Sequence, residues 1–238
     1  STSPGADTTP LYSPDGKDLA WRSQARAGFE ADKWRLLVQG RQSGKTRDVT
    51  EKFDRSIGSF AWDPDSELIW FTAEDHGEAP ISYVDALQEK ELREVARLHA
   101  DDLAFGPGNR LFFTRMSVGA PNEIYRLDIP ESKGNATAVT HMNDALLSQI
   151  DMQPLESFTF KGANDEEVQG FMVRPPGFDS NKKYPLKFLI HGGPQGAWGN
   201  DWTYRWNAEL FAATGNYVVV MINFHGSTGY GQKFTDSI

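Results

Sequence analysis

The chain has 238 residues, of which 39% are hydrophobic and 12% aromatic, enough for one large hydrophobic core or two smaller ones. Its formal net charge of -9 and its lack of a basic block disfavour nucleic acids and anionic membranes as partners, because both attract clustered Lys and Arg. The absence of cysteine excludes disulfides, a thiol nucleophile and cysteine-bound zinc. No apolar run approaches the roughly 20 residues of a membrane helix. Since the chain starts at Ser1 without a signal-like segment, we expect it to begin inside a longer protein.

A degenerate repeat runs through the first half of the chain. Each copy consists of an aromatic residue, a turn and a strand-like run of apolar and aromatic residues, and the copies lie at 12–21, 62–70 and 105–113. The prolines Pro14, Pro64 and Pro107 of the three turns are 50 and 43 residues apart. Because a propeller blade takes about 40 to 50 residues, the repeat predicts β-propeller blades, an all-β architecture, over residues 1–150.

Each repeat is followed by a segment with the pattern of a paired strand, at 34–39, 81–85 and 123–129. In the third of these, alternate positions are apolar, which is typical of a half-buried antiparallel strand. Further short strands are expected at 47–50 and 138–141, so that each unit has four strands. A β-sandwich with coincidental turn spacing is the alternative, and the length of the period favours the propeller.

The sequence changes character near residue 150, where we place the start of a second domain, 151–238. Segments 156–161 and 167–174 flank a polar turn and predict a hairpin. The continuous apolar runs 186–190 and 217–222 are typical of strands buried on both faces of a helix-covered sheet.

One helix is predicted between these two apolar runs. Trp206, Leu210 and Ala213 follow helical spacing, and Gly215 stands where a left-handed residue often ends a helix. Strand, helix and strand together predict a parallel crossover unit.

The motif most suggestive of chemistry is His191-Gly192-Gly193-Pro194, directly after the apolar run 186–190. Open α/β sheets bind ligands at the carboxyl ends of their strands, and glycines there let a backbone approach a substrate. In α/β-hydrolases a loop in this position supplies one N–H of the oxyanion hole. Paired glycines before proline also form ordinary turns. The next strand is followed by a second glycine-rich stretch, 223–231, which lacks the Lys of a phosphate-binding loop and the spacing of a dinucleotide site.

Several separated blocks of the last 80 or so residues, in this order, resemble the prolyl oligopeptidase family, especially its dipeptidyl-peptidase 5 and acylaminoacyl-peptidase branch. The blocks are 183–186, 191–196, 198–199, 205–207 and 223–231. The resemblance implies blades of an N-terminal β-propeller followed by the N-terminal part of an α/β-hydrolase domain, and cleavage of short peptides by a Ser, Asp and His triad. It implies that Gly193 supplies an oxyanion-hole N–H.

The family's GxSxG motif, Asp and His are expected after Ile238, so we predict that this chain, an internal fragment, lacks the triad and is inactive alone. Ser227 lacks the spacing of a nucleophile elbow, and His191 resembles a structural histidine of the family rather than a catalytic base. His225 departs from the Arg that many relatives carry, which leaves its substrate contacts open.

Acidic side chains raise a separate question, because a peptidase that removes dipeptides needs an acid for the substrate's free amine. Glu30 or Asp32 in a blade loop is a candidate, and a plain loop is the alternative. The acidic stretch 165–167 and the pair 101–102 are interpreted as solvated turns.

Segment 44–46 looks like the end of a phosphate-binding loop but lacks its first glycine. We expect no cofactor and no metal.

The functional hypothesis is therefore a fragment of a serine-type exopeptidase that acts on short peptides by acyl transfer. The alternatives are a non-peptidase α/β-hydrolase such as an esterase, and a propeller that serves as an interaction module with a vestigial hydrolase tail. The resemblance favours a periplasmic or secreted protein over a cytoplasmic one, and the sequence makes no prediction of oligomeric state.

Overall fold

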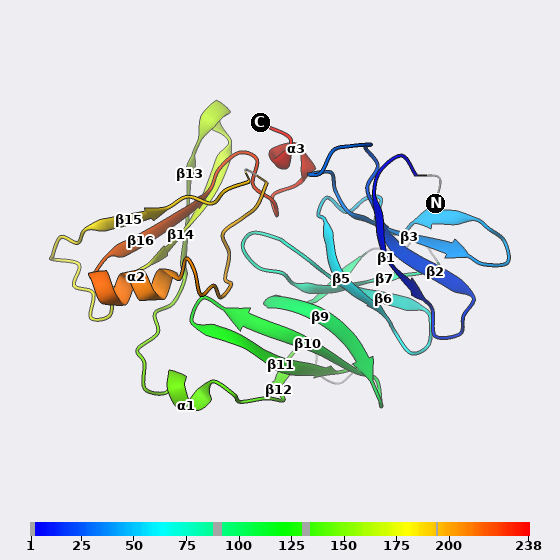
Figure 1. Ribbon diagram of the computed structural model, residues 1–238, viewed down its shortest axis with the longest axis horizontal. Helices are drawn as coiled ribbons and strands as arrows, with labels where there is room; N and C mark the ends of the chain where they lie inside the picture. Colours follow the sequence, from blue (N-terminus) through cyan, green and yellow to red (C-terminus); the bar gives the residue numbers. More distant parts are fainter. Residues whose placement is uncertain (1–2, 88–91, 130–133, 194) are drawn as a thin grey trace.

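The structure is a computed structural model that describes residues 3–87, 92–129, 134–193 and 195–238. Its strands form four separate sheets of four strands each (Figure 1). The first sheet contains β1 (Asp7–Tyr12), β2 (Asp18–Ser23), β3 (Arg35–Gly40) and β4 (Thr46–Asp48). The second contains β5 (Ile57–Trp62), β6 (Leu68–Ala73), β7 (Ile81–Asp85) and β8 (Arg93–Ala96). The third contains β9 (His99–Gly106), β10 (Arg110–Ser117), β11 (Ala120–Asp128) and β12 (Thr137–Ala138).

These three sheets are antiparallel and their strands pair in chain order. The predicted strands lie in them with small shifts of their ends, so four short strands per repeat are confirmed. Each repeat copy spans the turn between the first and second strands of its sheet. Within the described residues the sheets form an open stack, and no closed ring is seen.

Polar side chains close the turns of the first two repeats. The Asp63 carboxylate accepts hydrogen bonds from the backbone N–H groups of Glu67 (2.9 Å) and Leu68 (3.0 Å). Ser13 occupies the same place in the first repeat, and its hydroxyl accepts from Asp18 N–H at 3.0 Å. A side chain that satisfies the turn's own N–H groups explains why the repeat keeps a short polar residue before each of these two prolines.

The second sheet is buried on both faces, which is why β6 reads as a continuous apolar run. One face, with Ile69 and Phe71, packs against Leu36 and Val38 of the first sheet. The other face packs against the third sheet, and Trp70 lies in that second core cluster. Two apolar layers on opposite sides of one sheet contradict a two-sheet sandwich and fit consecutively stacked blades.

The fourth sheet is mixed and has the spatial order β13 (Glu156–Lys161), β14 (Glu167–Val173), β16 (Val218–Asn223) and β15 (Leu186–Leu189). β15 and β16 are parallel, and helix α2 (Ala208–Gly215) lies between them in the chain, so the predicted hairpin and crossover unit are both present. The remaining helical turns are α1 (Asp144–Leu147), the 3₁₀ turn η1 (Ala163–Asp165) and α3 (Gln232–Thr235). No helix in the described part of the chain combines the length and the apolar character needed to cross a bilayer.

The ends of α2 differ in part from the sequence prediction. The helix starts after Asn207, whose side-chain oxygen accepts Leu210 N–H at 2.8 Å. The left-handed residue at the other end is Asn216, with φ 53°, rather than Gly215. Asparagine tolerates this conformation because its short polar side chain costs little there.

The apolar residues with helical spacing point outward. Leu210 is 55% exposed, and Trp206 precedes the helix and is 49% exposed. The buried face carries Ala208, Glu209 and Ala212. The small side chains of the two alanines let α2 lie close to the sheet. The prediction that both faces of the strand are buried is wrong for β15. It is the edge strand of the sheet, and its Leu186 is 63% exposed.

The core of the mixed sheet contains one residue from the third sheet. Val118, in the turn between β10 and β11, is buried among Phe171 of β14, Leu189 of β15 and Met221 of β16. The blade thus inserts an apolar side chain into the neighbouring sheet, which fixes where the two parts meet.

Glu209 is the unusual member of the buried face of α2. Its side chain is 5% exposed, and its carboxylate accepts the backbone N–H of Gln153 at 2.8 Å. Burial raises the pKa of Glu209 to about 7, since one hydrogen bond does not replace the lost hydration of the charge.

We predict that this proton makes folding pH-dependent. The folded chain holds the proton up to about pH 7 while the unfolded chain releases it near the ordinary value of 4.5, so the free energy of unfolding falls as the pH rises between these values. Glu209→Gln keeps an acceptor for Gln153 and cannot ionise. Urea denaturation at pH 5 and pH 8 should show the variant more stable at pH 8 by about 1–3 kcal/mol, with little difference at pH 5. Equal pH slopes for the two proteins would contradict this.

Candidate functional site

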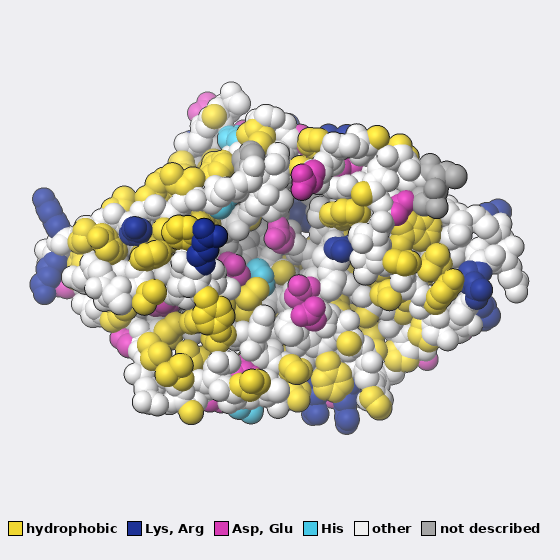
Figure 2. Space-filling view, in the orientation of Figure 1, with side chains coloured by type: hydrophobic (Ala, Val, Ile, Leu, Met, Phe, Trp, Pro, Cys, Tyr) yellow, Lys and Arg dark blue, Asp and Glu magenta, His cyan; other side chains and the backbone are white. Residues whose placement is uncertain are grey.

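A cleft of about 580 Å³ opens where the three stacked sheets meet the segments that follow the mixed sheet. Its wall includes Trp34 and Thr72 from the blades, and Gly193, Thr228 and Gln232 from the other side. Figure 2 shows the hollow between the two parts, with Asp and Glu side chains around it. Sequence segments more than 100 residues apart therefore form one site.

Carboxylates dominate the charge of this cleft. Five lining residues are acidic: Glu30, Asp32, Asp54, Glu74 and Asp101. Two of them bind the opposite wall, since Glu74 accepts the Thr228 hydroxyl at 2.5 Å and Asp54 accepts Gln232 N–H at 3.0 Å. The cleft favours a cationic group, and part of its acidity is used to hold its walls together.

Gly193 lies in the wall of this cleft. Its φ of 131° and the position of an added Cβ, 2.5 Å from Gln195 N, allow only glycine. Within the described chain no acceptor is found for the Gly193 N–H. Pro194, the last residue of the motif, lies outside the described residues.

His191 and Ser227 form a hydrogen-bonded pair that resembles a catalytic dyad by composition. The His191 Nδ1 lies 3.0 Å from the carbonyl of Gly192, so Nδ1–H donates there and Nε2 accepts the Ser227 hydroxyl at 3.0 Å. Ser227 is completely buried, and the His191 ring stacks on Phe224 at 4.4 Å. A nucleophile must reach solvent and substrate, so this geometry supports a structural role for both residues.

The Asn223 side chain joins the two glycine-rich stretches. It is fully buried; its oxygen accepts Trp198 N–H at 2.7 Å and its amide donates to Trp198 O at 2.8 Å. The same amide donates to the Tyr230 hydroxyl at 2.6 Å, which in turn donates to Gln169 of β14 at 2.7 Å. Burial raises the pKa of Tyr230 to about 12, so the hydroxyl keeps its proton and this donor role.

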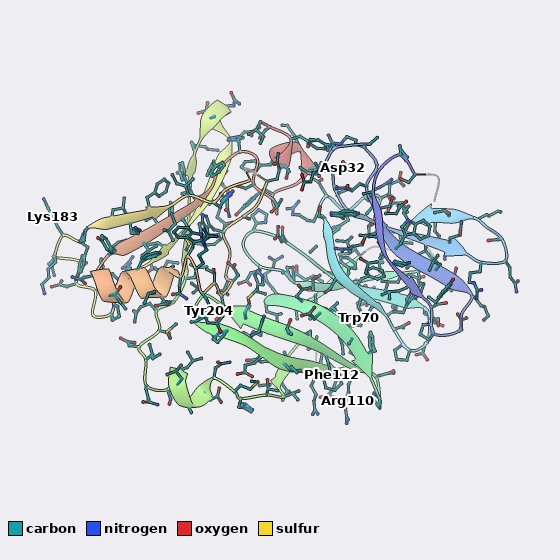
Figure 3. All side chains as sticks on the ribbon, viewed as in Figure 1. Asp32, Trp70, Arg110, Phe112, Lys183 and Tyr204 are labelled. Carbon is teal, nitrogen blue, oxygen red and sulfur yellow. The ribbon has the colours of Figure 1, made fainter. Side chains whose placement is uncertain are left out.

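Asp32, one of the two acids suggested for the substrate's amine, is already committed to its own loop. Asp32 is labelled in Figure 3. It is 7% exposed, and its carboxylate accepts Arg26 Nε at 2.7 Å and Ala25 N–H at 2.6 Å. Burial alone would raise its pKa, but these hydrogen bonds outweigh burial and lower the pKa. Glu30 also lines the cleft, and in the described part of the chain its carboxylate has neither a hydrogen bond nor an ion pair. Of the two candidates, Glu30 is the one with a carboxylate available to a ligand.

The His225 side chain contacts the β13–β14 turn and does not line the cleft. Its Nε2 lies 2.8 Å from the Glu166 carboxylate, which this contact keeps at a lowered pKa, and its ring stacks on Phe234 at 4.7 Å. The acidic stretch around Glu166, interpreted as a solvated turn, is thus in part an anchor for the 223–231 stretch. Gly44, in the segment that looks like the end of a phosphate-binding loop, lies in the turn that joins β3 to β4, where its N–H donates to Gly40 O at 2.8 Å.

Two asparagines that organise the site, Asn200 and Asn223, were not assigned a role from sequence. Asn223 lies in a block that carries the family resemblance, but its amide pairs with a backbone 25 residues away. Local patterns predict caps and turns and contain no signal for such a distant partner.

The chain was compared with known proteins. Residues 202–238 match the model of the prolyl oligopeptidase family. Dipeptidyl-peptidase 5 of Porphyromonas gingivalis is 35% identical over 235 residues, which cover 98% of this chain and 34% of the relative. Probable dipeptidyl-peptidase 5 of Arthroderma benhamiae is 34% identical over 239 residues, covering 98% of this chain and 32% of the relative. The chain spans about a third of the length of these curated relatives.

Among solved structures, uncomplexed acylaminoacyl peptidase of Pyrococcus horikoshii matches with a TM-score of 0.76 and 21% identity, over 93% of this chain and 33% of that one. At this identity the likeness concerns the fold, and the three antiparallel sheets correspond to propeller blades of that architecture. The family match at 202–238, the relatives along the whole chain and the fold agree, and over the third of the relatives' length that it spans the chain is similar to the prolyl oligopeptidase family.

Proposed function

We propose that the chain is part of a serine peptidase that cleaves short peptides near their amino termini by acyl transfer. Residues 1–150 are its C-terminal propeller blades, and 151–238 are the first part of its α/β-hydrolase domain. The observation that carries the proposal is the position of Gly193, which borders a cleft between blades and mixed sheet and whose N–H has no acceptor among the described residues.

The mixed sheet supports the hydrolase assignment. β15 and β16 are parallel with α2 between them, and the Gly193 loop follows the carboxyl end of β15. Sheets of this class bind their ligands at that end, so the loop is where an acyl group would be held.

The reaction needs a serine, and we assign it to the parent protein beyond residue 238, together with the Asp and His. The serine oxygen would attack the scissile carbonyl carbon as its proton passes to the His, and the electron pair of the C=O bond would move to the carbonyl oxygen. The oxyanion would then collapse to an acyl-enzyme as the C–N bond breaks and the amine leaves with the proton from the His. A water would finally hydrolyse the acyl-enzyme and restore the serine. The Gly193 N–H would donate to the oxyanion beside the N–H that follows the nucleophile.

The two rival functions differ in chemistry. An esterase would use the same oxyanion donor, but the blades that form half of the cleft and its acidic wall fit a peptide with a free amine better than a neutral ester. A pure interaction module would have no need for a backbone conformation at 193 that only glycine adopts readily.

The test is covalent labelling by a fluorophosphonate probe, which reacts with activated serines. The full-length protein should be labelled stoichiometrically at a serine beyond residue 238 and should release dipeptides or acylated residues from peptide substrates. The 238-residue chain should take up no probe, because the serine of the proposed triad lies beyond residue 238 and Ser227, the hydrogen-bonding partner of His191, is buried.

Ser227→Ala in the full-length protein is the matched control and should still be labelled at the serine beyond residue 238, since Ser227 is buried and donates to His191. Labelling of Ser227 would refute the assignment of the nucleophile. A full-length protein that hydrolyses simple esters but no peptide would favour the esterase, and one without any labelling would favour the interaction module.

Gly193 can be tested by semisynthesis of the full-length protein with an ester in place of the amide at residue 193. Loss of one oxyanion donor should lower kcat by about 10² to 10³, with little change in KM, because the ground-state carbonyl gains less from the donor. The same replacement at Gly192, whose N–H is not the proposed oxyanion donor, is the control and should be tolerated. If kcat at residue 193 survives within about threefold, Gly193 is a turn glycine.

A further inference from the structure

The loop between β6 and β7, residues 74–79, reaches across from the second blade into the segments that flank Gly193. Its Gly77 carbonyl accepts Asn200 N–H at 2.7 Å. A Cβ on Gly199 would lie 2.5 Å from that same carbonyl, so the two backbones are in direct contact. This blade loop therefore contacts segment 195–200, which immediately follows the Gly193 motif.

The Asn200 side chain adds two more contacts to the blades. Its Nδ2 donates to Glu78 Oε1 at 2.9 Å, and its Oδ1 accepts Val118 N–H at 2.9 Å. Val118 belongs to the turn that is buried in the core of the mixed sheet. One asparagine thus joins the second sheet, the third sheet and the segment after Gly193.

The same blade loop also holds the other end of this segment. Glu74 accepts the Thr228 hydroxyl at 2.5 Å, and the Thr228 N–H donates to Gly196 O at 3.0 Å. Segment 195–200 is therefore restrained at Gly196 through Thr228, and directly at Asn200. Gly192 and Gly193 are exposed and have no side chains, so the restraint of the motif comes from these flanking contacts and from His191.

We propose that Asn200, together with Glu78, is a positioning residue through which the blades hold the Gly193 N–H in place for catalysis. The inference rests on the proposed function. An oxyanion donor stabilises the transition state only when its position is fixed before the reaction, and a displacement of about 1 Å can cost on the order of 10²-fold in rate. A blade contact that fixes the loop makes the propeller a part of the catalytic geometry as well as a wall of the cleft.

The test uses the full-length protein and steady-state kinetics with a peptide substrate. Asn200→Ala should lower kcat by about tenfold or more while KM changes by less than about threefold. Binding of a peptide boronate, whose adduct places an oxygen in the oxyanion position, should weaken by a similar factor. Glu78→Ala should lower kcat in the same direction but by less, because the Val118 N–H still has its acceptor in Asn200. Glu78→Gln should retain most activity because its amide oxygen still accepts from Asn200, and the double alanine variant should be no worse than Asn200→Ala alone.

Asn143→Ala is the matched control, since Asn143 Nδ2 donates to Glu123 Oε1 at 2.7 Å, away from the cleft. It should leave kcat within about twofold. Should Asn200→Ala fail to fold, Glu78→Ala carries the same test with segment 195–200 intact. An active parent whose Asn200 and Glu78 variants keep kcat, or lose it only in proportion to a rise in KM, overturns this inference and leaves the proposed function standing. A parent without peptidase activity overturns both.

Discussion

The contact between the backbones of Gly77 and Gly199 is the constraint on which the rest of the site depends. Asn200 N–H and the Gly77 carbonyl are 2.7 Å apart, and a Cβ on Gly199 would collide with that carbonyl. Glycine at 199 is therefore what lets the second blade and the mixed sheet approach closely enough to share a cleft. The insertion of Val118 into the core of the mixed sheet locks the same junction from the third blade.

This junction explains why the residues of the cleft come from such distant parts of the chain. The blades supply most of the acidic wall, and the stretches after β15 and β16 supply Gly193 and Thr228. Buried side chains such as Asn223 and Ser227 hold those two stretches to each other. The arrangement separates two tasks: the blades present charge to a ligand, and the strand ends present backbone donors to a carbonyl.

Local patterns in the sequence predict much of this fold. The spacing of Pro14, Pro64 and Pro107 predicts three repeated units, because each turn carries its own chemistry. The position of Gly193 after an apolar run predicts a site at a strand end. Both inferences rest on interactions within a few residues of each other, which is where sequence patterns are informative.

The features that the sequence does not predict depend on packing and hydrogen bonds in the folded chain. Leu210 has the right spacing for a core face, yet it is exposed because Ala208 and Ala212 lie closer to the sheet. By sequence Asp32 is a plausible ligand-binding acid, but in the structure it is buried and paired with Arg26. Asn200 looks like any polar loop residue, and its three partners lie 82 or more residues away.

The most direct test of this account is the structure of the full-length protein with a peptide boronate bound to its serine. The account predicts that the backbone nitrogen of Gly193 lies within about 3 Å of the boronate oxygen in the oxyanion position. It also predicts that the Asn200 contacts to Gly77 and Glu78 are intact in the same crystal. A boronate oxygen held by other donors, with the Gly193 N–H turned away from it, would contradict the central claim.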